Sequence, residues 1–201
     1  MKRSRAFTTT RLADLSRSLT AAYGNDKGSK IFAAAESILA VELAGVNDRG
    51  NKMIGKHIRS IILPGYACYR AMLNVGICSS EAVEFIKAEL CRSTERMARL
   101  CKRLSSKSYA YGLIRSLMRV ILNYGYPKQG WTVVMLENNK ERIRFDITSC
   151  LYCEELQKRN ASELCPAFCY TDVASYTPLA PAVMFIRKGT SGSPMREDPL
   201  T

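Results

Sequence analysis

The sequence predicts an α+β fold in which an N-terminal helical half packs on a small C-terminal antiparallel sheet with a short helix. Three observations support this prediction. Apolar residues recur at helical spacing in the first part of the chain, and the pattern changes to short alternating segments after "NYGYPKQG". The composition, 47% hydrophobic and 24% charged residues, is that of a globular protein. A chain of this size hides roughly 70% of its surface on folding, so its core needs no disulfide.

The chain divides into a short entry segment and one domain. Residues 1–27 are basic and end in a turn-rich stretch, so we expect a flexible segment there. We expect a single hydrolase-like α+β domain over residues 28–201. It should be helical over 28–125 and contain the sheet over 126–190. Residues 191–201, rich in Gly, Ser and Pro, should form a loose tail.

The first helices follow from strong helix formers and clear stop signals. A helix rich in Ala, Leu and Glu fits Ser29 to about Leu43 and stops at "GVNDRG". Residues 51–74 read as a second helical region, broken or bent at Leu63-Pro64-Gly65.

The next two helices are amphipathic. Ser79-Ser80 offers an N-cap for a helix whose apolar stripe comprises Val83, Ile86, Leu90, Met97 and Cys101. A further amphipathic helix fits Ser108 to about Leu122.

The C-terminal half predicts a hairpin and a last strand. "WTVVML" and "RIRFDIT" are short, β-branched or alternating, and separated by the polar "ENNKE", which is typical of a β-hairpin. A short helix, "SCLYCEELQKRN", follows. "AVMFIR" is expected to be a last strand.

The chain is strongly basic, with a net charge of +12. A basic helical face followed by aromatic residues could contact nucleic acid, but we favour a solvated face because no recognition motif accompanies the charge. The residues concerned are Arg92, Arg96, Arg99, Lys102 and Arg103, then Tyr109, Tyr111, Tyr124, Tyr126 and Trp131.

Neither a membrane nor a targeting segment is expected. "IFAAAESILAVELAG" is interrupted by Glu36 and Glu42, and the basic N-terminus lacks an apolar stretch behind it. We therefore expect a cytoplasmic protein, in a reducing compartment where thiols stay free, bind metal or do chemistry.

Four of the eight cysteines cluster near the C-terminus with the spacing C-x2-C, eleven residues, C-x3-C. Structural zinc is one alternative, although C-x3-C is looser than the usual second pair. Iron–sulfur ligation fits the count but no known spacing. A disulfide cluster would need an oxidising compartment. These alternatives all concern Cys150, Cys153, Cys165 and Cys169.

A reactive thiol with a nearby carboxylate is the remaining alternative. Cys150 stands at the expected start of a short helix, which would lower a thiol pKa, and Cys169 lies three residues before Asp172. His57 is the single histidine, and we interpret it as structural.

At these residues the chain resembles the L-2-amino-thiazoline-4-carboxylic acid hydrolase family. The resemblance runs from about residue 60 to residue 192. It rests on "LPGYACYRAMLNVGICSSEAVEFIKAEL", "FDITSCLY", "ELCPAFCYTD" and "FIRKGTSG". The pattern Cys150 … Cys169-x2-Asp172 … Arg187-x2-Thr190 is specific in combination. Family members usually close with a further Cys-Asp-Phe, whereas here "SPMREDPLT" follows Gly192.

The resemblance implies a hydrolase that opens the 2-amino-thiazoline ring to N-carbamoyl-L-cysteine, in cysteine formation. Arg187 would bind the carboxylate of this small anionic substrate, and Thr190 would bind one of its oxygens. Asp172 would accept from the amidine or act as general base, and Cys169 or Cys150 would attack the ring carbon. No cofactor is expected on this reading. Zinc belongs to the alternative, a protein that binds metal or nucleic acid without catalysing a reaction.

Overall fold

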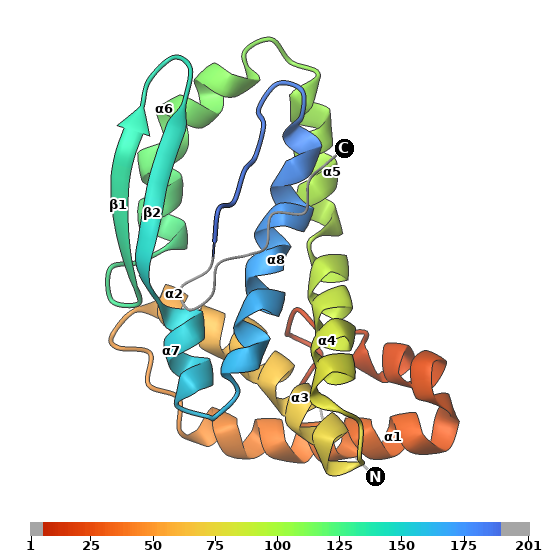
Figure 1. The fold of residues 1–201 in the computed structure, drawn as a ribbon. Helices are drawn as coiled ribbons and strands as arrows, with labels where there is room; N and C mark the ends of the chain where they lie inside the picture. The colour runs from red at the N-terminus through yellow and green to blue at the C-terminus, as the bar shows by residue number, and fades with distance from the viewer. Residues whose placement is uncertain (1–5, 190–201) are drawn as a thin grey trace.

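The computed structural model describes residues 6–189 (Figure 1). It confirms the predicted α+β class, with many helices and a two-stranded antiparallel sheet near the C-terminal end. The elements are α1 (Leu15–Ala44), α2 (Lys52–His57), η1 (Ile58–Ile62), α3 (Leu63–Asn74), α4 (Ser79–Ser93), α5 (Glu95–Ser105), α6 (Ala110–Gly125), β1 (Trp131–Asn138), β2 (Ile143–Cys150), α7 (Leu151–Gln157), η2 (Ser162–Leu164), α8 (Cys165–Tyr176) and η3 (Thr177–Leu179).

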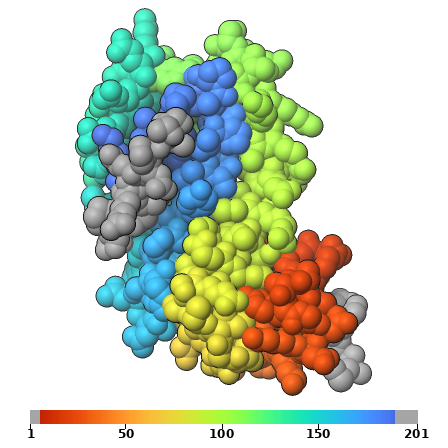
Figure 2. Space-filling model, turned by 45° about the vertical axis from the view of Figure 1, so that its right-hand side comes forward, coloured from red at the N-terminus to blue at the C-terminus, as the bar shows by residue number. Residues whose placement is uncertain are grey.

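Helices α1, α2, α3 and α7 lie toward one end of the molecule, and α5, α6 and the hairpin lie toward the other (Figure 1). α1 crosses one end of the molecule and packs on α3, while α4 and α5 follow one another along α8. The hairpin and α6 lie together on the other side of α8. The hairpin and α1 occupy opposite ends of the surface (Figure 2). None of the helices within residues 6–189 is long and apolar enough to cross a membrane.

α3 is the centre of the core. Nine of its twelve residues are buried, including Tyr69 and Met72, because it lies between α1 and α4. Gly65 lets the ring of Phe168 from α8 approach, and a Cβ on Gly65 would lie 2.7 Å from that ring. Burying each large apolar side chain contributes about 1.5–3 kcal/mol, so this helix anchors the fold that carries α8.

The N-terminal segment differs from the expectation of a loose stretch over residues 1–27. Residues 15–27 form the first part of α1, which also contains the helix predicted over residues 29–43. Phe7, Leu12 and Leu19 are buried in the common core. These apolar side chains stabilise the segment despite its charge. Gly24, at φ 78°, bends α1 within this region.

The helical region predicted to be broken or bent at Leu63-Pro64-Gly65 is not broken, but continues through a π-helical turn. The chain passes from α2 through η1 into α3, and Pro64 stands in the first turn of α3. A proline inside a helix leaves the carbonyl four residues earlier without its donor. That carbonyl belongs to Ser60, and it accepts a hydrogen bond from the backbone N–H of Arg11 at 2.8 Å.

The apolar stripe predicted on one helix is divided between α4 and α5, which meet at Thr94. Ile86, Leu90 and Cys101 are buried, whereas Met97 is 43% exposed. The N-cap of α4 is Cys78, so the cap prediction at Ser79-Ser80 is off by one residue.

The predicted hairpin is confirmed. β1 and β2 pair antiparallel with Trp131 opposite Cys150 and Met135 opposite Phe145. The prediction of a last strand at residues 182–187 is wrong, because the sheet of the described residues has two strands. This segment is held by a contact of Arg187 with α8. The predicted tail, residues 191–201, lies outside the described residues.

Candidate active site

The candidate site is centred on an ion pair between α8 and the segment that follows it. Arg187 Nη1 donates to Asp172 Oδ2 at 2.6 Å, and both side chains are mostly shielded from solvent. Burial raises the pKa of Asp172, and the Arg187 guanidinium opposes that rise. Arg187 Nε is buried and has no hydrogen-bond partner among the described residues. The guanidinium therefore keeps a free donor beside a carboxylate.

Cys169 lies one helical turn before Asp172 on α8 and is buried. Burial raises the pKa of its thiol to about 11. The Arg187 guanidinium lowers that pKa, whereas Cys150 and Asp172 raise it. Three other predicted groups thus act on the thiol of Cys169, which is protonated at neutral pH. A thiolate there needs a base to take its proton.

Cys150 enters the site from the sheet. It is the last residue of β2 and the N-cap of α7, half-buried at the junction of strand and helix. The predicted position of Cys150 at the start of a short helix is therefore confirmed. Thr190, the other predicted substrate contact, lies outside the described residues.

Cys153 and Cys165 are joined by a disulfide that links α7 to the start of α8, with 5.5 Å between their Cα atoms. We expected free thiols in a reducing compartment, whereas these two cysteines are oxidised to a disulfide. The cage of Cys150, Cys153, Cys165 and Cys169 is not formed either, since the disulfide uses Cys153 and Cys165 and leaves two of the four as free thiols. Among residues 6–189, no group of three or more His, Cys, Asp or Glu is placed to hold a metal ion.

Tyr152 is a neighbour of the site that sequence reasoning missed. Its ring packs between Trp131 and Phe168, and its hydroxyl lies 2.8 Å from Nδ1 of His57. Burial raises the pKa of this phenol, and so does the charge of Asp172. Tyr152 ends the stretch "FDITSCLY", so the family resemblance was the signal that could have pointed to it.

His57 forms the other side of this aromatic contact. Its ring meets Trp131 edge-on, and burial lowers its pKa to about 4, with Arg11 acting in the same direction. The imidazole is therefore neutral at physiological pH. This environment agrees with our interpretation of His57 as structural.

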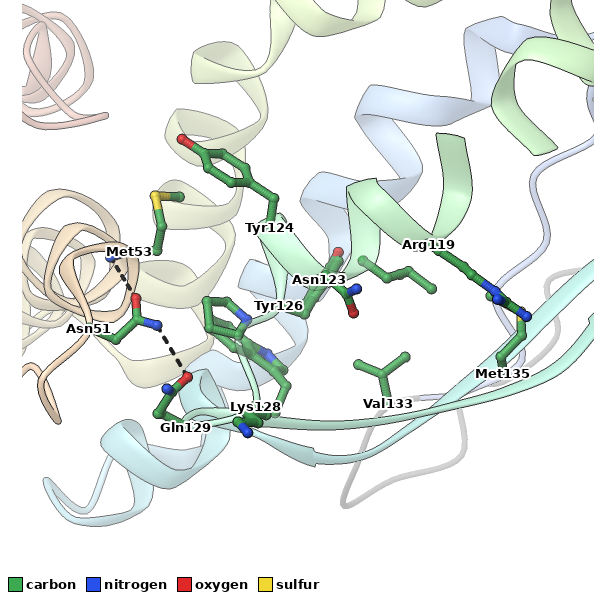
Figure 3. A pocket seen from close by; sticks show the side chains of 13 residues that line it. Asn51, Met53, Arg119, Asn123, Tyr124, Tyr126, Lys128, Gln129, Val133 and Met135 are labelled. Atoms are coloured by element: carbon green, nitrogen blue, oxygen red, sulfur yellow. Dashed lines mark hydrogen bonds between the residues drawn. The ribbon is translucent and has the colours of Figure 1, made fainter. Parts of the chain in front are cut away.

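A hollow of about 600 Å³ lies between α2, α6 and β1 (Figure 3). Cys169, Asp172 and Arg187 do not line it. Tyr126 does, and the charges of Asp172 and Arg187 both act on the pKa of its phenol. Tyr126 therefore links the hollow electrostatically with the ion pair. The lining residues are Asn51, Met53, Arg119, Leu122, Asn123, Tyr124, Tyr126, Pro127, Lys128, Gln129, Trp131, Val133 and Met135.

Comparison with known proteins adds one finding to this geometry. Curated proteins and solved structures gave no match. The family model described as L-2-amino-thiazoline-4-carboxylic acid hydrolase matches residues 56–193, well over half of the chain, and that range includes Cys150, Cys169, Asp172 and Arg187. The chain belongs to the L-2-amino-thiazoline-4-carboxylic acid hydrolase family.

Proposed function

We propose that this protein hydrolyses a small anionic cyclic amidine such as L-2-amino-thiazoline-4-carboxylate, giving N-carbamoyl-L-cysteine. The observation that carries the proposal is the Arg187–Asp172 ion pair beside the buried thiol of Cys169. Such a substrate requires a cation for its carboxylate, an acceptor for its amidine and a nucleophile for its ring carbon, and these residues could supply all three. The product would serve cysteine formation.

The reaction adds one water molecule across a carbon–sulfur bond. A nucleophile attacks C2 of the ring, the bond from C2 to the ring sulfur breaks, and the sulfur leaves as a thiolate that takes up a proton. Arg187 would hold the substrate carboxylate through its free Nε–H and the remaining guanidinium donors. Asp172 would then accept from the amidine or from the attacking group.

Cys169 is the first candidate nucleophile. Because its pKa is about 11, its proton must be removed before attack, and Asp172 is one turn away on the same helix. The amidine carbon would bond to sulfur while the ring opens, and water would then release the carbamoyl product and restore the thiol. In a direct route, Asp172 would deprotonate the attacking water instead. Cys150 is the second candidate nucleophile.

Replacement of single site residues tests these roles. We expect Asp172→Asn to lower the rate of ring opening by about 10²–10⁴-fold, the contribution typical of a general base. The measurement is chromatographic detection of N-carbamoyl-L-cysteine. Asp146→Asn is the matched control, since Asp146 is exposed on β2 and should leave the rate unchanged. Full activity of Asp172→Asn would refute the assignment.

The two routes are separated by the cysteine variants. Under covalent attack, Cys169→Ala abolishes turnover, and mass spectrometry of the quenched wild-type enzyme shows an adduct on Cys169. Under direct water attack, Cys169→Ala retains most of its rate. An adduct on Cys150 would instead identify this residue, at the end of β2, as the nucleophile.

A further inference from the structure

We propose that α6 is a self-association surface through which two copies of this chain pair antiparallel about a two-fold axis. The structure describes the whole of α6, and two of its sixteen residues, Ala110 and Leu122, are buried. Large apolar side chains are instead exposed along it: Leu113 42%, Leu117 44%, Val120 63%, Ile121 43% and Tyr124 67%. A contiguous apolar surface of this kind marks an interaction site.

This apolar stripe is not the side of α6 that holds the hairpin. On the hairpin side, the Tyr111 hydroxyl donates to the Asn139 carbonyl at 2.9 Å, and Leu122 and Arg119 line the hollow against β1. Tyr124 borders the hollow but points away from the strand (Figure 3), and the other four residues of the stripe do not line the hollow. The stripe is therefore largely exposed within the described part of the chain, which leaves it accessible to a partner.

The spacing of the stripe selects a second copy as that partner. Leu113, Leu117, Val120 and Tyr124 follow intervals of four, three and four residues, the spacing of a helix–helix seam. These intervals read the same in both directions. Under a two-fold axis that crosses the stripe midway between Leu117 and Val120, Leu113 meets Tyr124 of the partner subunit and Leu117 meets Val120 of the partner subunit. Such self-complementarity is what an isologous interface requires.

Charge distinguishes this partner from an anionic one. A helix that binds lipid headgroups carries its basic residues beside the apolar face, but Arg119 lies on the hairpin side, where it lines the hollow. Two copies of a chain with net charge +12 repel at long range. Screening by salt should therefore strengthen self-association, whereas it weakens binding to lipid or nucleic acid.

The size of the surface sets the expected affinity. A sixteen-residue helix is about 24 Å long, and a helix pair of that length buries less than the roughly 800 Å² per partner of a standard interface. We therefore expect a dimer that forms in the micromolar range and does not depend on the proposed activity.

Sedimentation velocity across protein concentration tests the proposal. We expect the wild-type chain to shift from monomer to dimer between about 1 and 300 µM, with a stronger shift at high salt. A monomer throughout this range would overturn the proposal. So would weakening of the dimer by salt. A monomer that binds phosphatidylglycerol vesicles would identify lipid as the occupant and equally overturn self-pairing.

Charge-exchanged variants test the antiparallel register. Leu117→Glu alone and Val120→Lys alone should each be monomeric, because each buries an uncompensated charge. Their equimolar mixture should restore a heterodimer, since Glu at 117 then faces Lys at 120 across the axis. Val41→Glu on α1, where the residue is 74% exposed, is the control and should dimerise like the wild type. Dimers formed by either single variant, or monomers in the mixture, would overturn the register.

Discussion

α3 and α6 are both apolar helices, yet they lie in opposite environments. α3 has nine buried residues of twelve, and α6 has two of sixteen, with both helices described in full. α3 lies between α1 and α4, whereas α6 is covered by the hairpin on one side. The difference shows that two helices of similar apolar content can bury very different fractions of their residues. The elements that pack against each helix decide that fraction.

The packing around glycines shows the same contrast. A Cβ on Gly28 of α1 would lie 2.7 Å from the backbone carbonyl oxygen of Leu19, whereas nothing lies within 4 Å of a Cβ on Gly112 of α6. The two parts of α1 on either side of Gly24 are therefore in close contact, whereas the region around Gly112 of α6 has room.

Truncation of one large side chain in each region should give the largest difference. We expect Met72→Ala to lower the free energy of unfolding by about 2–5 kcal/mol, because Met72 is fully buried and a cavity remains. Leu117→Ala, measured at dilute protein, should change it by less than about 0.5 kcal/mol. Urea denaturation of both variants checks this. Equal losses would show that α6 is as tightly packed as α3.

The pH dependence of stability tests the burial of His57. This residue lies at the end of α2, and its ring contacts Trp131 at the start of β1. Because the pKa of His57 is lowered from 6.5 to about 4, the unfolded chain takes up a proton below pH 6.5 that the folded chain takes up only near pH 4. The contribution of His57 to stability should therefore fall by about 3 kcal/mol between these pH values.

His57→Asn provides the control, because it removes the titrating group. Asp172 and Glu89, whose pKa values are raised, titrate in both proteins and cancel in the difference. The wild type should lose more stability than His57→Asn as the pH falls from 6.5 to 4. Parallel curves for the two proteins would contradict a buried neutral imidazole.

A matched pair of glycine substitutions should give the smallest effects, of opposite sign. Gly28→Ala should destabilise by about 1–3 kcal/mol, since the new methyl group meets backbone atoms. Gly112→Ala should stabilise by up to about 1 kcal/mol, since alanine favours an exposed helix. Thermal unfolding measures both. Destabilisation by Gly112→Ala would reveal a close contact at α6.

Several parts of the fold followed from local patterns. The hairpin was predictable because "WTVVML" and "RIRFDIT" differ in period from the helices before them. The π-helical turn was not, because no local pattern reveals that the Arg11 N–H reaches the Ser60 carbonyl from a distant part of the chain. "AVMFIR" has the composition of a strand, but no local pattern reveals that Arg187 is held by Asp172 on α8.

The site was predictable to the extent that the family resemblance supplied its residues. Cys169 and Asp172 share a helix turn, so their proximity followed from spacing once the helix was assumed. The Cys153–Cys165 pairing could not be derived, since four cysteines allow three connectivities. The contact between Tyr152 and His57 joins residues 95 positions apart, and neither carries a local signal of it.

The π-helical turn of η1 makes the number of residues between α2 and α3 a structural property in its own right. A π-helical turn closes i→i+5 hydrogen bonds and therefore holds one residue more than an α-helical turn. Deletion of one residue within 58–62 could convert this turn to ordinary α-helix and leave the inward face of α3 where it is. Insertion of a further residue would instead rotate that face by about 100°. The sequence thus tolerates a shorter connection here better than a longer one.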